Sequence, residues 1–161
     1  MTLVDRASAA SLVDRAKNII VTPKTEWQVV AGETPNIQQI ILGYVLPLAL
    51  IPAVATILGG LLFRSGIFFS MSYYIATALV AFVANVIGVF VTAFVIDFLA
   101  PNFGSEKGLG RAVQLVAYSY TPMWVAGILN IIPGLGIIAA LVGLYGIYLM
   151  YLGLPLLMKT P

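Results

Sequence analysis

A short stretch of the chain combines hydroxyl groups with a proline inside an apolar run. Residues 117–128 read AYSYTPMWVAGI, which brings Tyr118, Ser119, Thr121 and Pro122 together. Pro122 has no N–H to donate to the carbonyl of Tyr118, and lipid offers that carbonyl no substitute donor. One interpretation is structural: the neighbouring hydroxyl groups repair the break and pack against other helices. The other interpretations are a broken helix that exposes carbonyl oxygens to an ion or substrate, as in transporters, or a surface for a partner.

Other polar side chains also interrupt the apolar runs. They are Asn85, Asp97, Gln114 and Asn130. Asn85 can form a hydrogen bond between helices. An acid inside a membrane segment is a functional hypothesis by default, and Asp97 is the acid in question here. It lies near the end of its run, so the alternatives are contact with lipid headgroups or an ion pair with Lys107 or Arg111.

The residue types that are missing exclude most enzyme mechanisms. The sequence contains no Cys and no His, which removes thiol nucleophiles, zinc sites and histidine-based triads. An intramembrane aspartyl protease needs two buried acids, and only Asp97 is available. The GLG at 108–110 has no Walker lysine after it. We therefore predict no enzyme, no catalytic residue, no metal and no cofactor. The net charge of +2 is too small to suggest nucleic acid.

The composition indicates an integral membrane protein. Hydrophobic residues make up 61% of the chain and charged residues 9%, whereas soluble domains contain roughly 45–50% and about 25%. A water-exposed surface needs many more charges than this chain has. The lipid bilayer is therefore its expected surroundings.

The apolar runs are long enough to predict membrane helices, since a bilayer core of roughly 30 Å needs about 20 residues. The predicted spans are 40–63, 74–99, 112–132 and 135–158. Pro47 and Pro52 interrupt the first span, and the IIPGLGII of 131–138 predicts a tight helical hairpin between the last two. In the second span, Ala84, Gly88 and Thr92 form a face that another helix can approach closely. The predicted fold is an all-α integral membrane bundle of four transmembrane helices.

Residues 1–39 form the sizeable polar segment and predict an amphipathic helix. Its apolar stripe consists of Leu12, Val13, Ala16, Ile19 and Ile20. On this interpretation Arg15 and the other polar residues of 14–18 point elsewhere. The stripe suits docking either on the protein's own spans or on lipid. Thr22 and Pro23 predict the start of a second helix, and Thr34 with Pro35 predicts the start of the first span.

The basic residues predict the orientation. Arg64 falls on one side of the predicted layout, and the rest fall on the other: Arg6, Arg15, Lys17, Lys24, Lys107, Arg111 and Lys159. The expected location is the inner (cytoplasmic) membrane, with the N-terminal segment in the cytoplasm.

Several blocks of sequence resemble bacterial members of the YIP-domain (Ypt/Rab-interacting protein) family. They are RAKNIIVTPKTEW at 15–27, GYVLPLALIPAVATILGG at 43–60, AYSYTPMWVAGIL at 117–129 and LYGIYLMYLGLPLLMKTP at 144–161. The run from Ala117 to Pro122 resembles the Gly-Tyr-Ser motif of this family, with Ala117 in place of the glycine. Eukaryotic relatives bind small GTPases and organise membranes, but their Asp-Leu-x-Gly-Pro motif is missing here. The resemblance also implies a fifth span, so we expect either a truncated chain or a four-span member.

The leading functional hypothesis is a non-enzymatic membrane scaffold or organiser. It would act through helix packing and through cytoplasmic contacts of residues 1–39 and 100–111. A homo-oligomer or another membrane protein is the expected partner, and a subunit of a larger complex is a weaker variant. The alternative is a small transporter or channel built on the proline-broken spans one and three. Its water-accessible cavity would be lined by some of the polar residues Asn85, Gln114, Ser119, Thr121 and Asn130.

Overall fold

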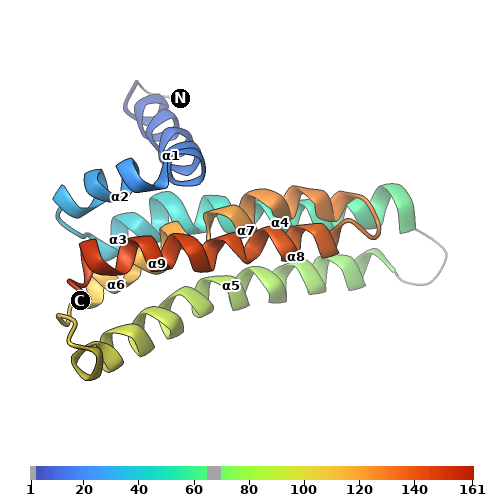
Figure 1. Cartoon of the computed structure of the whole chain (residues 1–161). Coiled ribbons are helices and arrows are strands. Elements are labelled where there is room, and N and C mark those ends of the chain that lie inside the picture. The colour runs from blue at the N-terminus through green and yellow to red at the C-terminus, as the bar shows by residue number, and fades with distance from the viewer. Residues whose placement is uncertain (1–2, 65–69) are drawn as a thin grey trace.

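The structure is a computed structural model that describes residues 3–64 and 70–161, and all regular elements in these ranges are helical. Figure 1 shows long helices lying side by side in a bundle, with α1 (Leu3–Val21) and α2 (Pro23–Gly32) packed on its outside near one end. The prediction of an all-α bundle is confirmed.

The first membrane helix is continuous over Ile37–Phe63 but changes its winding along the way. It consists of α3 (Ile37–Ile40), the π-helical η1 (Ile41–Val45), α4 (Leu46–Gly59) and the π-helical η2 (Gly60–Arg64). Asn36 caps its start, because the Asn36 side chain accepts a hydrogen bond of 3.1 Å from the N–H of Gln39. The predicted start at Thr34 and Pro35 is therefore too early.

The second and fourth predicted spans are also long apolar helices. The second is α5 (Met71–Leu99), which η3 (Ala100–Phe103) extends in 3-10 geometry. The fourth is formed by α8 (Gly136–Gly143) and α9 (Tyr145–Leu157). By length and composition, three helices in the described ranges can cross a membrane: Ile37–Phe63, Met71–Phe103 and Gly136–Leu157.

The third predicted span, 112–132, is not among these three helices, so the prediction of four transmembrane helices is wrong. This segment is divided into α6 (Leu109–Ser119), α7 (Thr121–Ala126) and the 3-10 helix η4 (Gly127–Ile131). The break falls at Tyr120 because Pro122 occupies the first turn of the next helix and cannot continue α6. The divided segment still runs along the bundle, with α6 against α5 and α9, and α7 against α4 and α8 (Figure 1). Residues 112–119 are all buried, so the other helices surround this part of it.

A tight turn joins η4 to α8, as the sequence predicts. η4 ends at Ile131 and α8 begins at Gly136. Gly134 in the turn has a φ of 88°, a conformation that glycine adopts without strain. The turn lets the chain reverse within a few residues and packs α8 back against α7.

The N-terminal helices dock on the bundle. Leu12, Ala16, Ile19 and Ile20 of the predicted stripe pack on the core, whereas Val13 is 60% exposed. Pro23 begins α2 as expected. The hydroxyl of Thr22 donates to the carbonyl of Asn18 at 3.2 Å, so its side chain closes α1 instead of capping α2.

The segment after η3 and the C-terminal residues lie together at one end of the bundle. The N–H of Glu106 donates to the carbonyl of Met158 at 2.8 Å, and the Glu106 carboxylate pairs with Lys159 at 2.9 Å. Figure 1 places α2 at this same end. Lys107 and Lys159, two of the basic residues that the sequence assigns to one side of the membrane, lie in these segments. The side chains of Arg6 and Arg64 lie outside the described residues.

Candidate functional site

The hydroxyl groups around the break in the third segment connect helices. Thr121 Oγ1 and the hydroxyl of Tyr44 form a buried hydrogen bond of 2.6 Å, which joins α7 to η1. The hydroxyl of Tyr120 and Thr92 Oγ1 form one of 2.9 Å, which joins the break to α5. Ser119 Oγ is buried and has no hydrogen-bond partner among the described residues. These groups pack against other helices as one interpretation expected, but their hydrogen bonds do not repair the carbonyls of α6.

Tyr118 lies at the centre of an aromatic cluster beside the break. Its ring contacts that of Tyr44 edge to face, with centroids 4.8 Å apart, and lies 6.3 Å from the ring of Trp27. Pro122 is buried in the first turn of α7. The motif residues 118–122 therefore form the contact between the N-terminal helices, the first span and the broken third segment.

Asn85 and Asn130 also join segments of the bundle. Asn85 Oδ1 accepts a hydrogen bond of 3.1 Å from Trp124 Nε1, and its Nδ2 donates to the carbonyl of Ala81. The backbone carbonyl of Asn130 approaches Gly59 so closely that a Cβ on that glycine would lie 2.7 Å from it. Both asparagines hold the third segment against its neighbours.

Asp97 does not form the ion pair with Lys107 or Arg111 that we considered. Its Oδ1 accepts a hydrogen bond of 2.6 Å from the N–H of Gly108, the residue that precedes α6. A carboxylate at this position also interacts favourably with the helix dipole. Lys107 is exposed, and Arg111 is engaged with other groups.

Arg111 fastens α2 to α6. Its guanidinium donates to the carbonyls of Val30 and Ala31 at 3.2 and 3.1 Å, and to Oε1 of Gln114 at 3.1 Å. These are carbonyls of the last turn of α2, and that of Val30 also accepts a hydrogen bond of 3.0 Å from the N–H of Glu33. Gln114 is 1% exposed, so Arg111 supplies a donor to a deeply buried amide.

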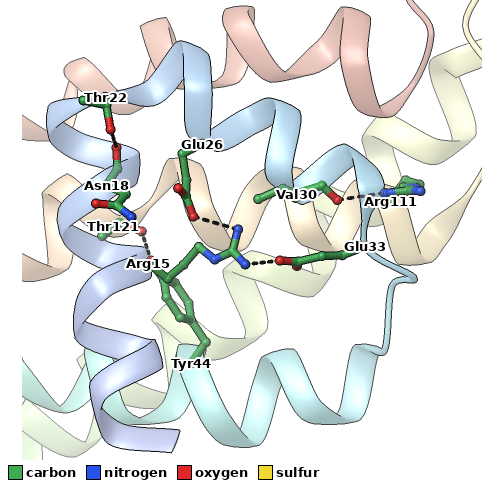
Figure 2. A network of polar contacts seen from close by, with 9 residues as sticks. All are labelled: Arg15, Asn18, Thr22, Glu26, Val30, Glu33, Tyr44, Arg111 and Thr121. Carbon is green, nitrogen blue, oxygen red and sulfur yellow. Dashed lines mark hydrogen bonds and ion pairs between the residues drawn. The ribbon is translucent and has the colours of Figure 1, made fainter. Parts of the chain in front are cut away.

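A buried ion network under α1 is the largest feature that the sequence reasoning missed (Figure 2). Arg15 Nη1 lies 2.9 Å from Oε1 of Glu26, an ion-pair contact that is not aligned as a hydrogen bond. Arg15 Nη2 donates to Oε1 of Glu33, and the guanidinium carbon lies 5.3 Å from the ring centre of Tyr118. Burial opposes the charged form of Arg15, but the hydrogen bond to Glu33 and the nearby negative groups outweigh it and raise its pKa above the ordinary value.

The spacing of α1 contains the signal that could have placed Arg15 inward. Arg15 follows Leu12 by three residues and precedes Ile19 by four, so all three share one helical face. The stripe drawn from the sequence included Val13 instead. The stripe was defined by apolar residues alone, so Arg15 was left out of it. The face that carries Arg15 nevertheless packs against tyrosine and glutamate side chains.

A cavity of about 700 Å³ adjoins this network. Arg15, Glu33, Gln114 and Tyr118 are among its lining residues. A second, apolar groove of about 310 Å³ lies between the end of α5 and α9. Of the polar residues predicted for a transport cavity, Gln114 lines the first space. The others line neither of these two spaces: Asn85, Ser119, Thr121 and Asn130.

Comparisons with known proteins agree with the resemblance drawn from the sequence blocks. Residues 17–161 match the Yip1 domain. The inner membrane protein YohC of Escherichia coli (strain K12) is 31% identical over 143 residues, which cover 83% of this chain and 73% of YohC. YohC of Escherichia coli O6:H1 (strain CFT073) gives the same values. No solved structure matches. With its apolar spans and a domain match over most of its length, this chain is a membrane protein of the Yip1 domain family.

Proposed function

We propose that the chain is a non-enzymatic organiser of the inner membrane, with its N-terminal helices on the cytoplasmic side. One observation carries the proposal: the polar groups of the spans bond to one another across helices. Asn85 bonds to Trp124, Tyr44 to Thr121, and Thr92 to Tyr120. Such bonds stabilise helix packing, whereas a transport or catalytic site keeps its polar groups available to a ligand.

Helix α5 offers the largest surface to a partner in the membrane. Of its most apolar stretch, 11% is buried, against 39% for the first span. The predicted close approach of a neighbouring helix at Ala84 and Gly88 is absent within the described chain: Ala84 is exposed, and a Cβ on Gly88 would meet no atom within 4 Å. We propose that a second copy or another membrane protein packs on this face.

Cysteine crosslinking tests whether a partner packs on this face of α5. The chain has no cysteine, so Ala84→Cys and Gly88→Cys introduce single reactive positions. In native membranes under mild oxidation, we expect disulfide-linked dimers or defined adducts at these positions. Gly143→Cys is the matched control, because Gly143 lies against Met123 of its own chain, with a Cβ contact of 3.5 Å. Equal crosslinking at all three positions would contradict a specific interface.

The second candidate is a small transporter, which the cavity beside Gln114 and Tyr118 favours. A transport path through the broken segment requires water to reach Thr121, which is 0% exposed. A transporter predicts that Thr121→Cys reacts with a charged methanethiosulfonate in membranes, and the organiser predicts that it is protected. Gly43 lines the cavity and is exposed, so labelling of Gly43→Cys is the positive control which shows that the reagent reaches the protein.

A further inference from the structure

The cavity beside Arg15 has the dimensions and lining of a ligand site. Its volume of about 700 Å³ lies within the range of roughly 300–1,000 Å³ that small-molecule sites occupy. Its exposed polar rim consists of Ser11, Thr34, Asn36 and Gln39. Its buried wall is formed by Tyr44, Gln114 and Tyr118. Polar groups thus converge on it from α1, from the start of the first span and from α6.

The accessible charge in this cavity is negative. Arg15 and Glu33 are the charged residues among its described lining. The Arg15 side chain is 16% exposed and is covered by Glu26, Glu33 and the ring of Tyr118, so its charge is already compensated. The Glu33 side chain is 38% exposed. Its Oε1 bonds to Arg15, and its Oε2 has no partner among the described residues.

The aromatic wall does not suit an anion. The rings of Tyr44 and Tyr118 form an edge-to-face pair, and the guanidinium of Arg15 already lies over Tyr118. Ring faces attract positive groups and repel anions. The other nearby guanidinium, that of Arg111, is occupied by the carbonyls of α2 and by Gln114. An anionic ligand would meet the carboxylate of Glu33 without a free basic group to bind it.

We infer that this cavity binds an alkylammonium group, which donates to the free carboxylate oxygen of Glu33. Asn36 begins the first membrane helix, so the rim lies where that span enters the bilayer. Two sources of this chemistry reach such a position: the ethanolamine headgroup of a phospholipid and a soluble amine. The inference is independent of the organiser function, since neither the α5 face nor its crosslinking involves this cavity.

The test uses the purified full-length chain in detergent with three probes. They are dioleoylphosphatidylethanolamine, dioleoylphosphatidylglycerol and soluble ethanolamine. Native mass spectrometry reports the lipids, and the thermal unfolding midpoint reports ethanolamine. We expect saturable binding of at least one amine probe and weaker binding of phosphatidylglycerol. Glu33→Gln should weaken amine binding about tenfold or more, since it removes a charged acceptor.

Gly43→Leu provides a variant that leaves every charge in place. Gly43 lines the cavity, and a Cβ there meets no atom within 4 Å, so the leucine fills the space without a clash. We expect it to abolish amine binding. Gly32→Leu is the matched control on α2, where a Cβ also meets no atom within 4 Å and the residue does not line the cavity, and it should bind like the wild type.

The pattern of binding identifies the source of the ammonium group. Binding of phosphatidylethanolamine without ethanolamine assigns the site to a lipid headgroup, and ethanolamine binding alone assigns it to a soluble amine. Wild-type affinity in Gly43→Leu would place any binding elsewhere. Equal binding of phosphatidylglycerol, or no binding of either amine, would overturn the inference.

Discussion

Two glycines of α9 determine how closely this helix approaches its neighbours. A Cβ on Gly146 would lie 2.5 Å from the carbonyl oxygen of Ser119, next to the break in the third segment. A Cβ on Gly153 would lie 2.6 Å from Leu115 and 2.9 Å from Trp27. All three distances are shorter than van der Waals contact. In membranes, where lipid competes with apolar side chains, such close backbone approach is a main source of packing energy.

Gly146→Ala should destabilise the bundle by about 1–3 kcal/mol, because the methyl group meets a backbone atom that cannot rotate away. Unfolding titrations with sodium dodecyl sulfate in mixed micelles would measure the loss. Gly88→Ala adds the same methyl group to α5 where no atom lies within 4 Å. A loss of equal size in both variants would show that the effect comes from the helix itself and not from the contact with Ser119.

The contacts of individual side chains could be predicted from the sequence only in part. The sequence singled out the residues around Pro122 because polar groups stand out against an apolar background. It could not show that Thr121 pairs with Tyr44, which is 77 residues away. Arg15 was overlooked because it lies in a polar segment, where one more charge is not conspicuous. Its partners became evident only when α2 folded back and brought Glu26 beside it.

At the scale of elements, buried charge joins α1 and α2 into a hairpin, and Arg111 and Tyr145 hold this hairpin on the bundle. Arg15 joins α1 to Glu26 of α2 and to Glu33 just beyond it. Tyr145 of α9 donates to the carbonyl of Ile20 at 2.9 Å, near the end of α1. Hydrophobic contacts alone would allow the hairpin to slide, whereas these directed contacts fix its position.

Arg15→Met should loosen this hairpin, because it leaves Glu26, which is 8% exposed, without its cation. Breaking a buried pair in this way costs about 3–5 kcal/mol. Tryptic cleavage after exposed Lys24 should therefore accelerate in the variant. The second variant Arg15→Met with Glu26→Gln should recover part of the protection. Unchanged cleavage in Arg15→Met would assign the docking to apolar contacts.

The pH dependence of this docking follows from the raised pKa of Arg15. A raised pKa adds stability at every pH below the ordinary value for arginine, and that stability is lost only as the pH rises above the raised pKa. Arg15 therefore remains charged between about pH 7 and 9. Tryptic protection at Lys24 should not fall within this interval when it is corrected for the activity of the protease. A fall there would identify a group other than Arg15.

Three of the four predicted membrane spans are long apolar helices, because a long apolar run has few alternatives in a bilayer. The sequence overestimated the third segment because a proline inside an apolar run can either kink a helix or end it. Here the chain ends α6 at Ser119, and the fragments pack among α4, α5, α8 and α9. That choice depends on the surrounding helices, which the local sequence does not contain.

At the scale of the whole molecule, polar ends and apolar spans are separated along the bundle. Composition alone identified the bilayer as the solvent, and the positions of the basic residues predicted which ends lie together. The contact between Glu106 and Lys159 joins two of the predicted cytoplasmic segments. Which membrane face they occupy stays a prediction.

Single-cysteine labelling tests this topology without background, since the natural chain has no cysteine. Lys24→Cys, Lys107→Cys and Lys159→Cys should react with an impermeant maleimide in inside-out vesicles and be protected in intact spheroplasts. Ile132→Cys, in the turn before α8, should show the reverse pattern. Labelling of positions 24 and 107 from opposite sides would overturn the layout.

The docking of the N-terminal hairpin also has a consequence for the order of synthesis. Residues 11–33 leave the ribosome before their partners, which include Arg111, Tyr118, Tyr145 and Gly153. The hairpin must therefore wait for these partners until α9 has been synthesised, although Arg15, Glu26 and Glu33 can already pair with one another. During that interval it is available to a chaperone or to the headgroups of the newly entered leaflet. Premature termination within α9 would remove part of the surface on which this hairpin docks.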